Sequence, residues 1–110
     1  MTYTINGKPY TKFDINVKCA ELSGSKSAKV HINCAHMPSL RDCVMTDFGV
    51  KDYCNKITDT EVIIDKCFHK LVEYDHHNDE IKWEALMDEH KCTKLVAACI
   101  CYIEINEGKL

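Results

Sequence analysis

Glycine is scarce in this sequence, and no glycine-rich loop is present. The four glycines, at positions 7, 24, 49 and 108, are too scattered for the G-x-G-x-x-G or P-loop patterns that cradle phosphates. No G-x-S-x-G nucleophile elbow occurs, and no two carboxylates stand out as a general acid and base. We therefore expect no enzymatic activity. A small enzyme with a Cys–His pair is left open, because the members of such a pair meet only in space.

Long apolar runs are also missing. The longest uninterrupted run, Leu95 to Ile103, has nine residues, whereas a membrane-spanning helix needs about 20. The first thirteen residues contain no apolar run of the length that a secretory signal requires. These absences predict a cytoplasmic protein that makes no contact with a membrane.

The composition is typical of one globular domain. The chain has 110 residues, of which 45% are hydrophobic and 28% are charged. It is long enough to bury a single core and too apolar for a disordered tail. We expect one domain over residues 1–110. The net charge of −3 argues against direct binding of nucleic acid, which requires a basic surface.

Eight cysteines are the unusual part of the composition. Disulfides do not persist in a reducing cytosol, and several of these cysteines fall in apolar segments, where a thiol behaves as a small hydrophobe. We expect buried free thiols, with no metal and no cofactor. A zinc-stabilised interaction module is the alternative, because Cys34 and His36 share one face of a predicted strand and His76-His77 in a turn would add ligands. No Cys-x₂₋₄-Cys pair supports that alternative.

The N-terminal residues predict a short strand followed by a helix. The strand covers residues 3–5 and ends at the Asn6-Gly7 turn signal. Asp14 is the expected N-cap of a helix that runs to Leu22, and Gly24 is a natural stop just beyond its end.

The middle of the chain is harder to interpret. Residues 29–34 alternate polar and apolar side chains, as in a half-buried strand. Residues 35–55 predict a loop-rich segment with one short strand near Val44. The capping-box pattern at residues 58–61, Thr-Asp-Thr-Glu, then predicts the start of a helix that runs to about His69.

The C-terminal part predicts a hairpin and a buried helix. Alternating apolar residues from Ile81 to Met87 follow a polar turn at 75–79 and predict a β-hairpin that carries Trp83. Residues from Thr93 to Ile105 are apolar on nearly every side, as in a central helix. The expected fold class is α+β: about three helices packed on a short, mainly antiparallel sheet.

Five landmarks stand out in this half: Asp52-Tyr-Cys-Asn55, the helix opened by Asp59, the paired isoleucines Ile63-Ile64, the hairpin strand with Trp83, and the closing stretch Lys94-Leu-Val-Ala-Ala-Cys-Ile-Cys-Tyr102. Together they resemble the NinX-like family of small tailed-phage accessory proteins. The family carries similar stretches, CNNPxDAWPII and LRAACIVFL. The resemblance covers roughly residues 52–105, and residues 10–24 more loosely. Glu61-Val62 departs from it, because the family has Trp-Pro there.

The family has no agreed biochemical activity, so the resemblance implies a context and not a reaction. That context is a phage or prophage gene expressed in a bacterial cytoplasm. Proteins of this kind often bind a host protein and block it, including restriction and CRISPR machinery. We therefore expect a phage-encoded, non-enzymatic inhibitor of a host protein, with an anti-CRISPR or anti-restriction role as the most plausible form. This step rests on association and not on the physics of a site.

The charge distribution indicates where a partner would bind. Residues 1–41 carry a net charge of +4, residues 42–90 carry −8, and residues 91–110 carry +1. An acidic face would steer onto the basic nucleic-acid-binding surface of a host protein. We expect this partner-binding face to consist of the acidic residues around the predicted hairpin, namely Asp75, Asp79, Glu80, Glu84, Asp88 and Glu89.

The alternative is that the same residues only keep a small protein soluble. A homodimer through the sheet edge or the closing helix is also left open.

Overall fold

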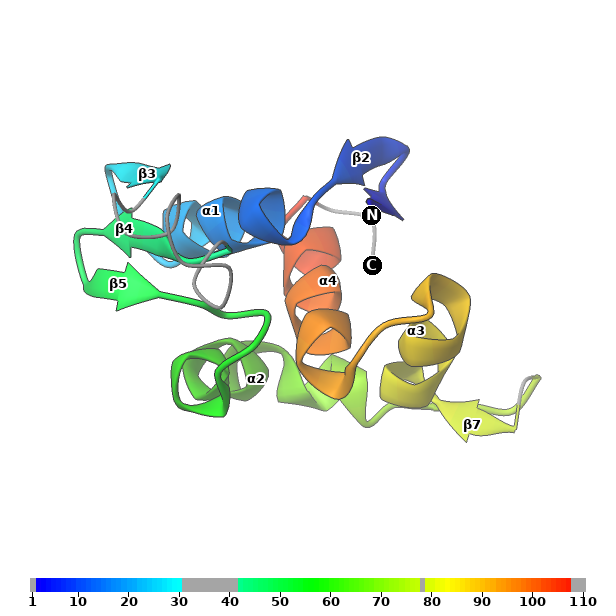
Figure 1. Ribbon diagram of the computed structural model, residues 1–110. Coiled ribbons are helices and arrows are strands. Elements are labelled where there is room, and N and C mark those ends of the chain that lie inside the picture. The colour runs from blue at the N-terminus through cyan, green and yellow to red at the C-terminus, as the bar shows by residue number, and fades with distance from the viewer. Residues whose placement is uncertain (1, 31–41, 78, 108–110) are drawn as a thin grey trace.

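Helix α4 (Lys94–Asn106) forms the centre of the fold. The computed structural model describes residues 2–30, 42–77 and 79–107. All residues of α4 from 96 to 103 are buried, and a helix that is apolar on every side must be surrounded by other elements. Three helices pack against it in Figure 1: α1 (Lys12–Leu22), α2 (Ile57–Leu71) and α3 (Lys82–His90). The predicted closing helix is confirmed, with Thr93 as its N-cap.

The strands lie around this helical centre as three small antiparallel sheets. Two are the hairpins β1–β2 and β6–β7, and the third has the order β3–β4–β5. The described strands are β1 (Tyr3–Ile5), β2 (Lys8–Tyr10), β3 (Ala28–Val30), β4 (Val44–Thr46), β5 (Gly49–Lys51), β6 (Tyr74–Asp75) and β7 (Glu80–Ile81). The predicted α+β class is confirmed, and the described part of the chain contains four helices, not about three.

The start of α1 differs from the prediction. The N-cap is Thr11 and not Asp14. Thr11 Oγ1 accepts a hydrogen bond from Asp14 N at 3.1 Å, and Asp14 Oδ2 accepts one from Thr11 N at 2.9 Å. Asp14 therefore fills the third helical position of a capping box, a role in which aspartate replaces the more usual glutamate. The predicted end at Leu22 is confirmed, and Gly24 follows it with a φ of 107°.

The start of α2 also differs, because hydrogen bonds in the turn that precedes the helix override the capping-box pattern. The predicted capping box is absent: Lys56 is the N-cap, no side chain caps the helix, and Thr58 is exposed. Ahead of the helix, Lys56 N donates to the Asp52 carbonyl at 3.0 Å. Within its first turn, Thr60 is buried, and its hydroxyl donates to the carbonyls of Tyr53 and Lys56. The turn from Asp52 into the helix therefore sets the helix start.

The predicted strand with Trp83 is wrong, since residues 82–90 form α3. Trp83 and Leu86 are buried, and Met87 packs against the same core. These positions follow the three- and four-residue spacing of a helix. The alternating pattern placed Leu86 on the polar side and so missed it. Trp83 Nε1 also donates to the Lys94 carbonyl at 2.8 Å, which ties α3 to the start of α4.

The section between α1 and α2 is only partly described. The expected short strand near Val44 is confirmed as β4, and β5 was not expected. Asp47 and Phe48 form the turn between the two strands, and Gly49 follows with a φ of 100°. A left-handed residue after a two-residue turn is a common hairpin closure, for which glycine is favoured. The predicted strand at 29–34 is described only through β3, and the rest lies outside the described residues.

A buried polar network holds α1 against the chain that leads into α2. The buried Asn16 donates from Nδ2 to the Asp42 carbonyl at 2.7 Å and to Asp52 Oδ1 at 3.0 Å. Its Oδ1 accepts from Cys54 N at 3.0 Å. Asp52 also accepts from Asn55 Nδ2 at 3.1 Å. Because buried polar groups must be paired, these bonds fix the position of the segment between β5 and α2.

Candidate binding surfaces

The first candidate surface lies on the β6–β7 hairpin and on α3. Strand pairing places Asp75 directly opposite Glu80. Helix α3 begins two residues after Glu80, and its residues Glu84 and Asp88 lie one turn apart on the same side. We call these four residues the acidic face: Asp75, Glu80, Glu84 and Asp88.

The four carboxylates are close enough to affect one another. Burial raises the pKa of Glu80, and so do its hydrogen bond with Asp88 and the negative charges of Asp88, Glu84 and Asp75. Like charges directly opposite in a strand pair are unfavourable for folding. The structure therefore concentrates negative charge at this end of the molecule at some cost in stability.

The other two residues predicted for this site lie beside the acidic face. Asp79 is in the hairpin turn, with a φ of 57°, and accepts a hydrogen bond from the Tyr74 hydroxyl. Glu89 is on another side of α3, where its Oε2 lies 3.3 Å from Nε2 of His90. The structure thus brings four of the six predicted residues together and separates Glu89 from them.

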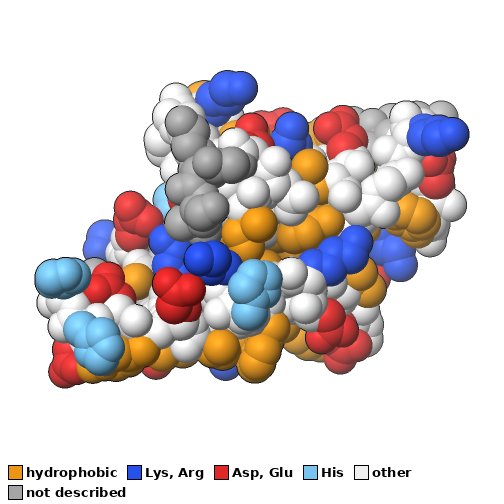
Figure 2. Space-filling model, turned by 180° about the vertical axis from the view of Figure 1, so that it is seen from behind, with side chains coloured by type: hydrophobic (Ala, Val, Ile, Leu, Met, Phe, Trp, Pro, Cys, Tyr) orange, Lys and Arg blue, Asp and Glu red, His pale blue; other side chains and the backbone are white. Residues whose placement is uncertain are grey.

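Lysine and histidine side chains border the acidic face. A cavity of about 400 Å³ next to it is lined by Lys70, Lys82, His76 and His77, among others. Figure 2 shows acidic, histidine and lysine side chains next to one another at this end of the molecule. A partner at this surface would meet a concentrated negative patch with a mixed rim and not a uniformly negative surface.

The second candidate surface is a cavity at the opposite end, between the β4–β5 hairpin and the first half of α2 (Figure 1). We call it the Tyr53 pocket. Its volume is about 270 Å³, and its walls include Phe48 and Val62, which are 49% and 52% exposed. The tip of Phe48 lies close to Gly24, at the end of α1. The pocket therefore joins the end of α1 to the β4–β5 hairpin and to α2, the next helix along the chain.

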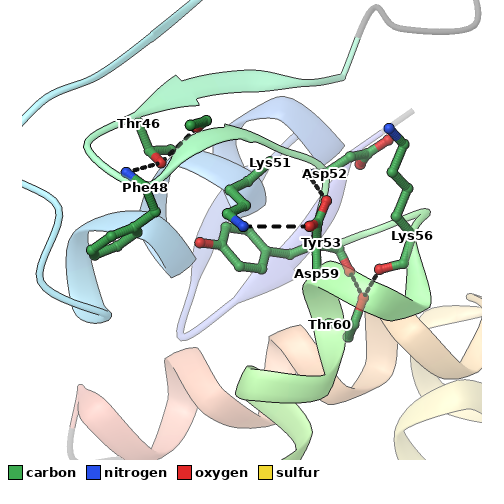
Figure 3. A network of polar contacts seen from close by, with 9 residues as sticks. Thr46, Phe48, Lys51, Asp52, Tyr53, Lys56, Asp59 and Thr60 are labelled. Atoms are coloured by element: carbon green, nitrogen blue, oxygen red, sulfur yellow. Dashed lines mark hydrogen bonds and ion pairs between the residues drawn. The ribbon is translucent and has the colours of Figure 1, made fainter.

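The polar groups of the Tyr53 pocket are shown in Figure 3. Lys51 lies beside Tyr53, and its Nζ is 3.6 Å from Oδ1 of Asp59. Asp59 also accepts a hydrogen bond from Asp52 N at 2.9 Å, so its carboxylate is already paired. Lys66 lines the pocket too, and its Nζ is 5.8 Å from the ring centre of Tyr102.

Sequence reasoning missed the Tyr53 pocket entirely. Phe48 and Val50 lie in the segment predicted to be loop-rich, and no pattern at Lys51, Tyr53 or Lys66 indicates a pocket. The pocket exists because the end of α1, the β4–β5 hairpin and α2 meet there. No local pattern encodes that contact.

The cysteines form no candidate site in the described residues. Seven are free, and six of these are buried. Cys92 is the partly exposed one, and burial raises its pKa to about 11, so it is a neutral thiol at pH 7. Reactive cysteines have a lowered pKa and an accessible sulfur. Cys92 therefore lacks the lowered pKa of a nucleophile in a Cys–His enzyme.

Metal binding finds no support in the part of the chain that the structure describes. No three His, Cys, Asp or Glu side chains converge there in a way that could hold an ion. Cys34 and His36, two of the proposed zinc ligands, lie outside the described residues. The zinc-stabilised module therefore stays a prediction.

Comparisons with family models, with curated proteins and with solved structures found no match to this chain. The resemblance to the NinX-like family therefore also stays a prediction. Over the described residues, no helix combines the length and the apolar character needed to cross a bilayer. The apolar side chains of α4 are buried within the chain, which leaves a sheet edge as the remaining candidate for a dimer contact.

Proposed function

We propose that this protein is a non-enzymatic binding protein whose acidic face docks on a basic, nucleic-acid-binding surface of a partner protein. The observation that carries the proposal is that Asp75 lies directly opposite Glu80 and that Glu84 and Asp88 lie beside them on α3. Such a patch competes with the phosphates of a nucleic acid for the same lysines and arginines.

The resemblance to phage accessory proteins supports a more specific form of the proposal. In that form the partner is a host protein of a nucleic-acid-handling defence complex, of the restriction or CRISPR type, and binding inhibits it in the bacterial cytoplasm. A protein that inhibits its partner by occupying a surface needs no catalytic residues. This form rests on association with the family and not on the geometry of the acidic face.

Charge reversal tests the proposal. The double variant Glu80→Lys/Glu84→Lys changes the acidic face, while Glu21→Lys/Glu61→Lys makes the same change at two exposed sites on α1 and α2. Both variants and the wild type are used to isolate partners from bacterial lysate at low and high salt. Each retained protein is then assayed for nucleic-acid binding.

We expect the wild type to retain, in a salt-sensitive manner, a protein whose nucleic-acid binding it blocks. The first variant should bind this protein at least about tenfold more weakly, because each reversal replaces an attraction with a repulsion. The second should bind it as the wild type does. Equal binding by both variants, or retention that salt does not weaken, would rule out the acidic face as the docking surface. Circular dichroism checks that both variants are folded.

A further inference from the structure

The size of the Tyr53 pocket limits what can occupy it. Pockets for cofactors and drug-sized ligands typically have volumes of about 300 to 1,000 Å³. The Tyr53 pocket, at about 270 Å³, falls just below this range. It has room for one large side chain, inserted between the apolar walls that Phe48 and Val62 provide. Its size suits one anchor side chain of a larger molecule better than a whole cofactor.

Tyr53 supplies a hydrogen-bond donor to the pocket that it lines. The residue is only 3% exposed, and its hydroxyl makes no hydrogen bond to another described residue. Figure 3 shows the hydroxyl directed towards the side on which Phe48 lies. Burial raises the pKa of Tyr53 to about 12, so the group stays protonated and can donate at neutral pH. An acceptor on an incoming ligand would satisfy it.

The charges that line the pocket favour a negative acceptor. Lys51 and Asp59 form an ion pair and balance each other. Lys66 forms no ion pair with a carboxylate in the described residues, so one positive charge on the pocket lining is uncompensated. A carboxylate placed near Lys66 and the Tyr53 hydroxyl would gain a charge interaction and a hydrogen bond together.

The strand next to the pocket indicates how the rest of such a ligand would bind. β5 is the edge strand of the β3–β4–β5 sheet in the described residues, and it faces α2 across the pocket (Figure 1). Val50, at the centre of β5, is 41% exposed. A free strand edge offers backbone N–H and C=O groups to an extended peptide, and pockets beside it select side chains.

We propose that the Tyr53 pocket and the edge of β5 together bind an extended peptide segment of a partner protein, in which an apolar side chain neighbours an aspartate or glutamate. The apolar side chain enters between Phe48 and Val62. The acidic side chain accepts a hydrogen bond from Tyr53 and pairs with Lys66. This surface is separate from the acidic face and has the opposite preference, because it takes a negative ligand.

A selection experiment tests the specificity. A library of random heptapeptides, displayed inside a fusion so that their termini are not free, is selected on the immobilised full-length chain. We expect the bound peptides to share an aromatic or branched aliphatic residue next to an Asp or Glu. Failure to enrich any motif, or enrichment of basic peptides, would overturn the proposal.

Three variants then locate the binding. The affinity of the best enriched peptide is measured by fluorescence anisotropy. Lys66→Glu should weaken it about tenfold, and Tyr53→Phe, which removes only the hydroxyl, about fivefold. Lys70→Glu, the same charge change one turn further along α2 and outside the pocket, should leave the affinity unchanged. Equal affinity for Lys66→Glu and the wild type would show that the peptide binds elsewhere.

Two further measurements separate other outcomes. Peptide affinity should be the same in Glu80→Lys/Glu84→Lys as in the wild type, so this test and that of the acidic face can fail independently. Sedimentation then compares the free wild-type chain with Lys66→Glu. The two should have the same oligomeric state, so the result should show no self-association that Lys66→Glu abolishes. If it does show this, a second copy of the chain occupies the pocket and the proposal of a partner peptide is wrong.

Discussion

In α4 every residue from Val96 to Ile103 is buried, whereas the β4–β5 hairpin exposes about half of Phe48 and much of Val50. Both regions are rich in apolar residues, yet they use them differently. The side chains of α4 contact three other helices and stabilise the fold. Those of the hairpin remain open to solvent at the edge of a cavity.

This difference in exposure predicts that stability depends mainly on α4 and that binding depends mainly on the hairpins. Substitutions in α4 should change the free energy of unfolding strongly and affect binding only through folding. Substitutions in the hairpins should change stability little and binding directly. The β6–β7 hairpin, with its clustered carboxylates, belongs with the second group. The following predictions test this division, from the largest expected effect to the smallest.

The largest effect is expected from Ile100→Ala in α4. Ile100 is fully buried in the core cluster, so the substitution removes apolar contacts and leaves a cavity. The free energy of unfolding should fall by about 3 to 4 kcal/mol, as measured by urea denaturation. Ile57→Ala, the same change at a residue of α2 that is 51% exposed, is the control and should cost less than about 1 kcal/mol. Similar losses for both variants would contradict the central role of α4.

Asn16→Ala should have the next largest effect. The substitution removes three hydrogen bonds and leaves Cys54 N and one Asp52 oxygen without their Asn16 partner inside the fold. We expect a loss of about 2 kcal/mol, since unpaired buried polar groups cost about 1 to 3 kcal/mol. The exposed Asn106, which bonds only the Tyr102 carbonyl, is the matched control. If Asn106→Ala lowered the free energy of unfolding as much as Asn16→Ala, the effect of Asn16→Ala could not be assigned to the buried polar network.

Gly49→Ala tests the hairpin beside the Tyr53 pocket. Nothing lies within 4 Å of an added Cβ, so the only penalty comes from the φ of 100°. We expect the free energy of unfolding, measured by urea denaturation, to fall by about 1 kcal/mol. The neighbouring Val50→Ala should change stability by less than about 0.5 kcal/mol, because Val50 is exposed. A loss of several kcal/mol in Gly49→Ala would mean that the hairpin belongs to the core.

The smallest effect is expected at Glu104, and it should depend on pH. Its Oε1 is the one buried side-chain oxygen or nitrogen in the described residues without a hydrogen bond, and burial raises the pKa of Glu104 above its ordinary value of 4.5. The folded state therefore binds this proton more tightly than the unfolded state. Stability from this group is full below pH 4.5 and is lost as the pH rises through the raised folded value.

Glu104→Gln should remove this loss. At pH 7 the variant should be more stable than the wild type by up to about 1 kcal/mol, a modest figure because the side chain is only half-buried and solvent screens its charge. At pH 4 the two should be equally stable. The exposed Glu61→Gln, denatured under the same conditions, should match the wild type at both values. A Glu104→Gln variant that is less stable at pH 7 would contradict the expected cost of burying this charge.

The fold was largely predictable where one pattern governed a whole element. The buried helix at α4, the stop at Gly24, the Asn6-Gly7 turn and the strand near Val44 were all anticipated. The prediction failed at residues 81–87, because alternating apolar residues in a short segment also match part of a helical pattern. Trp83 and Leu86, three residues apart, show that the helical spacing was the correct one.

Of the two candidate surfaces, the acidic face was predicted from the sequence and the Tyr53 pocket was not. Four residues of the acidic face were predicted, because an acidic stretch of sequence stays close in space when a hairpin leads directly into a helix. The Tyr53 pocket was not, because Phe48, Tyr53 and Lys66 come from a turn, a loop and a helix that only the packed structure brings together.

The sequence by itself determined the α+β class, the helix that must be buried and the acidic character of residues 42–90. These depend on composition and on periodicity, which are local. Only the packed structure shows how the segment between β5 and α2 is held against α1, and that a pocket lined by Tyr53 lies beside an edge strand. Those features depend on hydrogen bonds and contacts between distant segments, such as the bonds from Asn16 to Asp42, Asp52 and Cys54, which no local pattern contains.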